Sequence, residues 1–100
     1  MRGILKGRGP VSITINIPPS LRHLAGGKVV TEVDGRDVGH CLELLVERFP
    51  GLKTRLFDTG ARLRDWIEVY VNQESCHPEG LARVVRDGDE IEIAETIAGG

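Results

Sequence analysis

The stretch VSITINI, residues 11–17, alternates strictly between apolar and polar side chains. Successive side chains of a β-strand point to opposite faces, so this alternation predicts a strand with one buried face. The apolar side chains that share that face are Val11, Ile13, Ile15 and Ile17. The strand is expected to end at Pro18-Pro19, because proline has no N–H to donate to a ladder.

A second strand is predicted over residues 28–34 (KVVTEVD), after the turn-forming pair Gly26-Gly27. The short connection to the first strand favours an antiparallel hairpin. The buried face of this strand stays open, because Val29 and Val33 share one face while Val30 lies on the other.

Two later stretches alternate in the same way, at residues 66–72 (WIEVYVN) and 90–95 (EIEIAE). Their inward side chains are Ile67, Val69 and Val71 in the first and Ile91 and Ile93 in the second. Asn72-Gln73 and Asp87-Gly88 predict turns. A further short strand is expected near residues 82–86.

The main helix is predicted over residues 38–49, where apolar residues recur at helical spacing. These residues are Val38, Leu42, Leu45, Val46 and Phe49. Asp37 can cap the helix by accepting from amides of its first turn. Pro50-Gly51 is a stop signal.

A helical turn is expected after the main helix, before a loop over residues 58–65. Its core-facing residues are Leu52, Leu56 and Phe57. The order of elements is then β-β-α-β-(β)-β. One amphipathic helix and a mixed sheet of four or five strands each have one apolar face, and the simplest packing lays the helix across the sheet. The fold class is therefore α+β, and by analogy a β-grasp (ubiquitin-like) fold whose first and last strands lie parallel in the middle.

Size and charge set limits on function. The chain has 100 residues, 40% hydrophobic and 28% charged, with a formal net charge of −2, which indicates one globular domain at residues 11–98. The basic residues are scattered along the sequence and do not form the cluster that would indicate nucleic-acid binding. No run spans a bilayer and residues 1–10 do not form a secretory signal, so a cytoplasmic protein is expected. Residues 1–10 are interpreted as a flexible extension.

The two cysteines, Cys41 and Cys76, each have a histidine neighbour, His40 and His77. Adjacent side chains on regular elements diverge, which disfavours a Cys2His2 metal site and a His40-Cys41 catalytic dyad. Cys41 is expected to be a small buried hydrophobe on the helix, and Cys76 a loop thiol. The sequence contains no phosphate loop, zinc-protease motif or nucleophile elbow, so no catalytic residue and no bound metal are predicted.

The last two residues, Gly99-Gly100, remain as a possible site of chemistry. Glycine lacks a side chain, so such a segment can enter a narrow channel in an extended form. Adenylation by ATP would turn a terminal carboxylate into a mixed anhydride, which sulfur could convert into a thiocarboxylate. A frayed end without function is the alternative for a diglycine taken by itself.

In its ordered motifs the sequence resembles the MoaD/ThiS family of sulfur-carrier proteins. The matching pieces are Ile17-Pro18, Leu21-Arg22, Gly26-Gly27, Val33-Asp34-Gly35, Val38-Gly39, Phe49-Pro50-Gly51-Leu52, Val69-Tyr70-Val71-Asn72, Asp87-Gly88-Asp89-Glu90 and Ala98-Gly99-Gly100. The resemblance implies a carrier rather than an enzyme, with no cofactor of its own. An E1-like enzyme would use ATP to adenylate Gly100, beside the obligatorily small Gly99. A sulfur-transfer or synthase partner would then serve molybdopterin, thiamin or cysteine synthesis.

Partner contacts are expected on the tail at Ile97 and Ala98 and on the exposed sheet face at Tyr70, since exposed aromatics can anchor interfaces. Arg62 and Arg64 are weaker candidates.

The sequence departs from the family pattern in two places. The run Ala94-Glu95-Thr96-Ile97 is more polar than the apolar, proline-containing run of many relatives, which bears on partner choice. Gln73 stands where glycine is usual. The spacing at residues 51–65 favours the longer carriers, including those of cysteine biosynthesis. Two alternatives stay open: a ubiquitin-like modifier joined through Gly100 to lysines, and a β-grasp interaction module with an idle tail.

Overall fold

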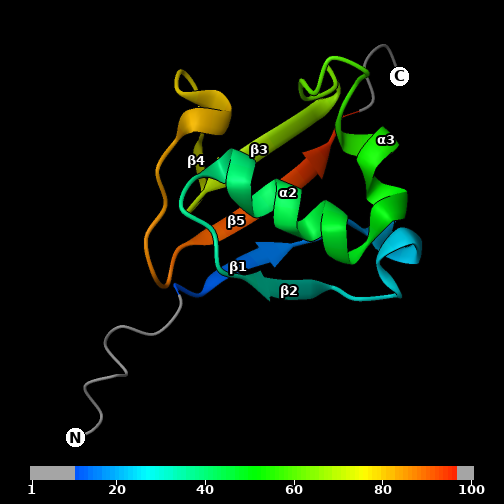
Figure 1. The fold of residues 1–100 in the computed structure, drawn as a ribbon, viewed down its shortest axis with the longest axis horizontal. Helices are drawn as coiled ribbons and strands as arrows, with labels where there is room; N and C mark the ends of the chain where they lie inside the picture. The colour runs from blue at the N-terminus through cyan, green and yellow to red at the C-terminus, as the bar shows by residue number, and fades with distance from the viewer. Residues whose placement is uncertain (1–10, 97–100) are drawn as a thin grey trace, which may run out of the picture.

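A mixed five-stranded sheet organises the chain in the computed structural model, which describes residues 11–96 (Figure 1). The strands follow the spatial order β2-β1-β5-β3-β4. Their bounds are β1 Ile13–Asn16, β2 Val30–Val33, β3 Ile67–Val71, β4 Glu74–Ser75 and β5 Glu90–Glu95. The predicted extension at residues 1–10 and the diglycine segment at 99–100 lie outside the described residues.

The strand directions are those of a β-grasp. The first and last strands, β1 and β5, pair in parallel, with Ile15 opposite Ile91. The other pairs, β1 with β2, β3 with β5 and β3 with β4, are antiparallel. The predicted fold class and the predicted parallel pairing of the first and last strands are therefore confirmed.

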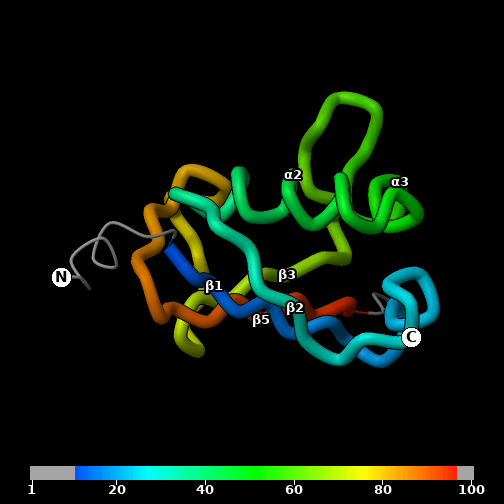
Figure 2. Tube along the Cα trace, turned by 60° about the horizontal axis from the view of Figure 1, so that its bottom comes forward, coloured from blue at the N-terminus to red at the C-terminus, as the bar shows by residue number. Residues whose placement is uncertain are grey.

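The main helix, α2 (Val38–Arg48), crosses one face of the sheet, and α3 (Lys53–Leu56) lies on the same side (Figure 2). Asp37 caps α2 as predicted, because its carboxylate accepts from the His40 N–H at 2.7 Å. Three short 3-10 helices complete the elements: η1 Pro19–Ala25, η2 Pro50–Leu52 and η3 Gly80–Ala82.

The core lies between α2 and the sheet. Alternate strand residues point into it, and so do the apolar stripe of α2 and the helical turn that follows it. The largest fully buried side chains are Ile13, Ile15, Ile17, Leu21, Leu42, Leu45, Leu52, Leu56, Ile91, Val38, Val69 and Val71. On β2 the buried residues are Thr31 and Val33, whereas Val30 is 43% exposed, which settles the face that the sequence left open.

The strand predicted near residues 82–86 is wrong. This stretch follows η3 and makes an isolated bridge between Val84 and Asp37. Its backbone bonds go to the loop before α2 instead of to a sheet edge: Val38 N–H donates to Arg83 O at 2.9 Å, and Val85 N–H to Arg36 O at 3.1 Å. The edge position beside β3 is taken by β4, which follows a tight turn.

Candidate functional site

The described chain ends at the point where β5 leaves the sheet. The predicted tail residues Ile97, Ala98, Gly99 and Gly100 lie outside the described residues. The structure therefore shows the base of the tail rather than its carboxylate. We call this base the tail root, defined as Glu95 and Thr96 with the residues that hold them, Ser20, Arg55 and Trp66.

Two sets of contacts fix the tail root. The Thr96 N–H and Oγ1 both donate to the Trp66 carbonyl, at 2.7 and 3.1 Å. The Glu95 carboxylate accepts from Ser20 Oγ at 2.5 Å through one oxygen and meets Arg55 Nη2 at 3.4 Å through the other. The Glu95 side chain is only 14% exposed. These contacts tie the end of β5 to η1, α3 and the start of β3, and Figure 1 shows β5 ending beside α3.

The second part of the candidate site is the face of the sheet that points away from α2, which we call the outer sheet face. One row of residues crosses all five strands on this face, as the pairings between neighbouring strands show. In spatial order the row is Val30, Asn16, Glu92, Tyr70 and Ser75. Glu92 therefore lies on the central strand, directly beside the half-buried Tyr70.

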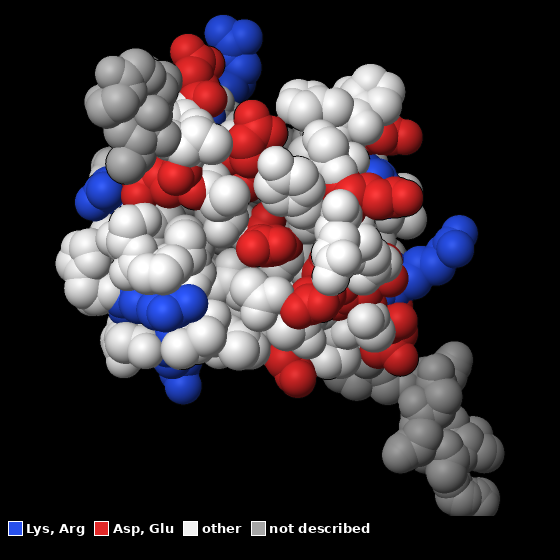
Figure 3. Space-filling view, turned by 180° about the vertical axis from the view of Figure 1, so that it is seen from behind, with Lys and Arg blue, Asp and Glu red and all other residues white. Residues whose placement is uncertain are grey.

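The outer sheet face is anionic. None of the five strands contains a Lys or Arg. Four glutamates alternate outward from the buried positions, at Glu32, Glu68, Glu90 and Glu92. Figure 3 shows acidic side chains across the middle of this face. Like charges so close together repel, so a cationic surface would bind here with favourable electrostatics.

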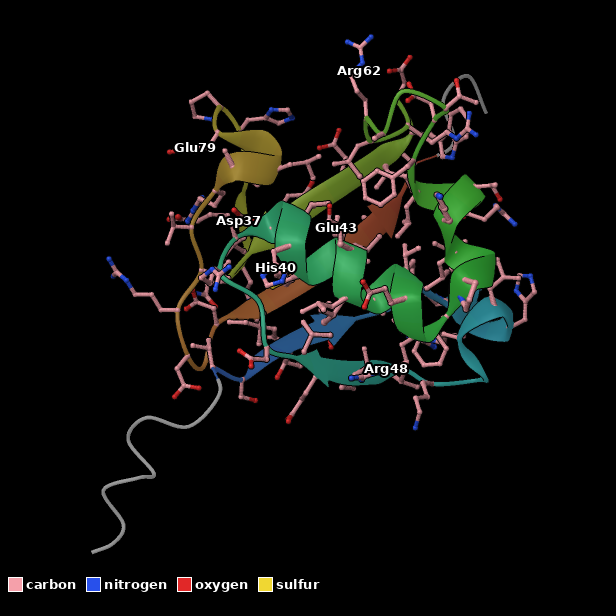
Figure 4. All side chains as sticks on the ribbon, viewed as in Figure 1. Asp37, His40, Glu43, Arg48, Arg62 and Glu79 are labelled. Atoms are coloured by element: carbon pink, nitrogen blue, oxygen red, sulfur yellow. The ribbon has the colours of Figure 1, made fainter. Side chains whose placement is uncertain are left out.

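The two arginines proposed as weaker contacts lie differently. The Arg64 guanidinium sits 5.4 Å from the centroid of the Trp66 ring, and its Nε donates to Thr54 O at 3.0 Å. Arg64 therefore belongs to the surroundings of the tail root. Arg62 projects from the loop into solvent (Figure 4). Its backbone N–H donates to Asp58, and this hydrogen bond is the main cause that lowers the pKa of the Asp58 carboxyl.

A hollow of about 790 Å³ lies between α2 and the loop after α3, on the side opposite the outer sheet face. Its lining includes Glu43 and Glu47 of α2, Phe57 and Asp58 of the loop, and Arg64. Figure 4 shows Glu43 on the exposed side of α2. The lining of the hollow therefore mixes acidic, basic and apolar side chains.

Both cysteines are buried. Burial raises the pKa of the Cys41 thiol to about 11 and also raises the pKa of Cys76. Cys41 is thus the small buried hydrophobe that the sequence predicted, and its thiol is protonated at neutral pH. The neighbouring His40 accepts the Arg36 N–H through Nδ1 at 3.2 Å. Within residues 11–96, no three His, Cys, Asp or Glu side chains are grouped to hold a metal ion.

Comparison with known proteins agrees with this geometry. The ThiS family profile matches residues 15–100. Sulfur carrier protein CysO of Mycobacterium tuberculosis is 31% identical over 93 residues, 90% of this chain and 100% of CysO. Small archaeal modifier protein 1 of Haloferax volcanii is 34% identical over 82 residues, 80% of this chain and 91% of that protein. A chain of the Amycolatopsis orientalis BexX/CysO complex superposes with a TM-score of 0.80 at 36% identity, covering 88% of this chain and 99% of that one.

The fold and these relatives place the molecule in the class of ubiquitin-like carrier and modifier proteins. Within this class, the chain belongs to the ThiS family. The resemblance that the ordered motifs indicated is confirmed. Its relatives are small carriers and modifiers rather than enzymes, and the chain is of the same kind. In the described part of the chain, no helix has the length and apolarity needed to cross a membrane.

Tyr70 lies on the face of β3 that the alternation of residues 66–72 predicted, whereas the tail root, which depends on Glu95 and Trp66, was not predicted. One signal was present. In EIEIAE, Glu95 lies two residues after Ile93 and four after Ile91, both of which point inward. The alternation therefore predicts that the Glu95 carboxylate also points to the buried side of the sheet. Its partners could not be read from the sequence, because Ser20 and Arg55 are 75 and 40 positions away.

Proposed function

We propose that the protein is a sulfur carrier whose Gly100 carboxylate is activated by an E1-like enzyme and converted into a thiocarboxylate. The observation that carries the proposal is the family match, which runs through residue 100 and so includes the diglycine. The chemistry is supplied by partners. The carrier contributes a carboxylate that follows a firmly held tail root.

The steps follow from carboxylate chemistry. A Gly100 oxygen attacks the α-phosphorus of ATP, and pyrophosphate leaves. The acyl adenylate is a good electrophile because AMP is a far better leaving group than oxide. Hydrosulfide from a sulfur donor then displaces AMP and leaves the thiocarboxylate. ATP is therefore a substrate of the activating enzyme and not a cofactor of this chain. The proposal places the protein in the cytoplasm, where ATP is available.

The E1-like partner docks, in this proposal, on the outer sheet face. Ordering the tail costs about 1–2 kcal/mol per residue, so contacts with Ile97 and Ala98 alone give weak binding and the folded domain must supply most of the affinity. Tyr70 is the aromatic anchor beside Glu92, and the matching partner surface is basic. That the Amycolatopsis CysO was solved as a complex with BexX supports a protein partner for this chain.

Intact mass after purification from the native host tests the chemistry. Exchange of one carboxyl oxygen for sulfur supports the carrier. Deletion of Gly100 should abolish the modified species, and thiocarboxylate formation that survives the deletion would overturn the proposal.

Docking is tested by the KM of the carrier in the adenylation reaction. Tyr70→Ala should raise KM about tenfold or more, as expected for a truncated interface anchor. Val84→Ala is the matched control, because Val84 is 66% exposed and lies outside the sheet. Equal KM values for the two variants would exclude Tyr70 from the interface.

A modifier function is the second candidate, because the chain is 34% identical to a small archaeal modifier protein. The same adenylate would then react with lysine ε-amines to form isopeptide bonds. Ladders of lysine-linked adducts in the native host, absent after deletion of Gly100, would favour this alternative. A Gly100 that stays unmodified under all growth conditions would exclude both functions and would favour a β-grasp interaction module.

Among the molybdopterin, thiamin and cysteine pathways, we propose the cysteine branch, since the spacing of residues 51–65 resembles that of the longer carriers. Deletion of the gene should then create a requirement for cysteine. A requirement for thiamin, or loss of molybdenum-enzyme activity, would assign one of the other pathways.

A further inference from the structure

Glu95 breaks the pattern of the strand that contains it. The inward positions of β5 are the buried Ile91 and Ile93, and Glu95 is the next residue of the same parity. A carboxylate therefore occupies a place where an apolar side chain would continue the core. It is 14% exposed, and it meets Ser20 Oγ and Arg55 Nη2. A broken local rule of this kind often marks a functional residue.

Stability does not account for Glu95. The Arg55 side chain is 42% exposed and the pair is 3.4 Å apart, and ion pairs with such exposure add little to stability. Removing a carboxylate from water is costly, and an apolar residue at a buried ionic position is often neutral or stabilising. The contacts of Glu95 therefore offset the cost of its own burial and leave little surplus for the fold.

These contacts lie at the point where the chain leaves the sheet. Glu95 is the last residue of β5, and Thr96 follows it before the tail. Ser20 of η1 and Arg55 of α3 hold Glu95, and the Trp66 carbonyl holds Thr96. The Glu95 backbone is paired with Ile67 in the β3–β5 ladder, the Glu95 side chain adds contacts to η1 and α3, and the Thr96 backbone is held at Trp66. Together these contacts determine the direction in which the chain leaves the sheet.

We propose that Glu95, Ser20 and Arg55 form a clasp that aims the C-terminal tail into the activating enzyme, so that the three are positioning residues for reaction at Gly100. This inference rests on the proposed function. Docking on the outer sheet face brings the domain to the enzyme, and the clasp limits the directions that the tail samples after docking. Restricting the approach of two reacting groups raises the rate of the bound complex rather than its affinity.

The test separates kcat from KM in pyrophosphate release by the E1-like enzyme, with Glu95→Gln and Arg55→Gln as the variants. We expect kcat to fall about tenfold, less than the roughly hundredfold cost of a fixed 1 Å misplacement because the tail can still reach the correct position, while KM stays within about twofold. Arg83→Gln is the matched control. It removes the pair of Arg83 with Glu74, a similar ion pair at 3.6 Å that lies near β4 and η3.

Two further variants separate positioning from folding. Glu95→Leu should keep or raise the thermal midpoint and still lower kcat, which a purely structural role would not produce. The exchange Arg55→Glu with Glu95→Arg should recover much of kcat, because the opposite charges again face each other. A kcat of Glu95→Leu equal to wild type, or single and exchanged variants that are equally slow, would overturn the clasp.

An NMR measurement on the isolated protein tests the clasp without the enzyme. In ¹⁵N relaxation, the Thr96 and Ile97 amides should become more mobile in Glu95→Gln than in wild type and Arg83→Gln. Unchanged relaxation would overturn the clasp. A wild-type protein that is never adenylated would instead overturn the proposed function, whatever the relaxation data show.

Discussion

The two faces of the sheet come from the same strands, yet they differ completely. The inner face is packed against α2, and its buried side chains are isoleucines and valines together with Thr31. The outer sheet face carries glutamates, small polar residues and Tyr70, with Val30 and Ala94 as its apolar members, and no strand contains a cationic residue. Because side chains along a strand point alternately to the two faces, neighbouring residues of one strand belong to different faces.

This difference shows where function can reside. Side chains of the inner face fix the fold, and changing them costs stability. Side chains of the outer sheet face contribute little to packing, so their common negative charge is free to serve binding. Glu95 is the exception, a largely buried carboxylate on the inner side at the end of the sheet nearest the tail. Substitutions on each face should therefore have separable effects.

Leu42→Ala should have the largest effect on stability. Leu42 lies on α2 against the inner face and is fully buried, so the change removes apolar contacts and leaves a cavity. The free energy of unfolding should fall by about 2–5 kcal/mol. Urea denaturation followed by circular dichroism measures it. Leu24→Ala is the control in a partly buried site, and an equal loss there would contradict the ranking.

Raising the pH should lower the free energy of unfolding through Cys41, which is buried on α2 against the sheet. Burial raises the pKa of this thiol from 9.0 to about 11, so the folded state holds its proton where the unfolded state releases it. The contribution is full below pH 9 and is lost as the pH rises towards 11. The shift corresponds to about 2–3 kcal/mol.

The measurement for Cys41 is the difference in stability between wild type and Cys41→Ala, taken from pH 7 to pH 11. The difference should shrink above pH 9, because the variant has no thiol at this position to titrate. A constant difference across this range would show that the burial of Cys41 has no effect on its ionisation.

Gly35→Ala should cost about 1–3 kcal/mol, the range for forcing an extra group into a packed site. A Cβ at Gly35 would overlap Cys41 Sγ and lie 3.0 Å from the Cys41 backbone. Thermal unfolding of Gly35→Ala can be compared with Gly27→Ala, where the Cβ meets no atom within 4 Å but φ is +80°. Because the φ of Gly35 is not in the left-handed region, only crowding can destabilise Gly35→Ala, and a Gly35→Ala variant as stable as wild type would show that Cys41 moves aside for the added methyl group.

The contrast between the two faces was visible in the sequence, because alternation is a local property. The strand patterns predicted β1, β2, β3 and β5 to within about two residues, and the Asp37 cap predicted the start of α2. Interactions that depend on distant residues were not visible. Val84 and Val85 are residue types common in strands. Their segment nevertheless pairs with the loop before α2 instead of with a sheet edge.

The structure shows what the two departures from the family pattern contact or adopt, at Gln73 and in the polar run before the diglycine. Gln73 stands where glycine is usual, and it still adopts the left-handed backbone that favours glycine, with φ 73°, next to Asn72 with φ 51°. The polar run before the diglycine contains Glu95, whose partners come from η1 and α3. The sequence could show that these positions were unusual, but not what they contact.

Asp89 should show a smaller, acid-dependent effect at the end of the sheet far from the tail. Hydrogen bonds from the Asn72 side chain at 3.0 Å and the Arg86 N–H at 2.8 Å lower the pKa of its carboxyl. Its contribution is therefore present above about pH 4, near the unfolded value, and is lost as the pH falls through the lower folded value. Asp89→Asn should cost less than about 1 kcal/mol at pH 7, because the group is partly exposed.

The difference in unfolding free energy between wild type and Asp89→Asn should shrink as the pH falls below about 4 and should vanish once the pH is below the lowered pKa of Asp89. A difference that persists at low pH would show that the hydrogen bonds act without the charge. Asp87→Asn is the comparison, because Asp87 also accepts a backbone hydrogen bond, from the Ser12 N–H.

Glu92→Gln should have the smallest effect on folding, and it completes the comparison of the two faces. Glu92 is exposed at the centre of the outer sheet face, with Glu90 two residues before it on the same side. Removing one of several like charges should change stability by less than about 0.5 kcal/mol, with any change towards greater stability. Binding to the proposed activating enzyme should nevertheless weaken and lose part of its salt dependence, because in that proposal the charge faces a basic surface. Affinity equal to wild type at both low and high salt would show that the negative charge of this face serves no partner.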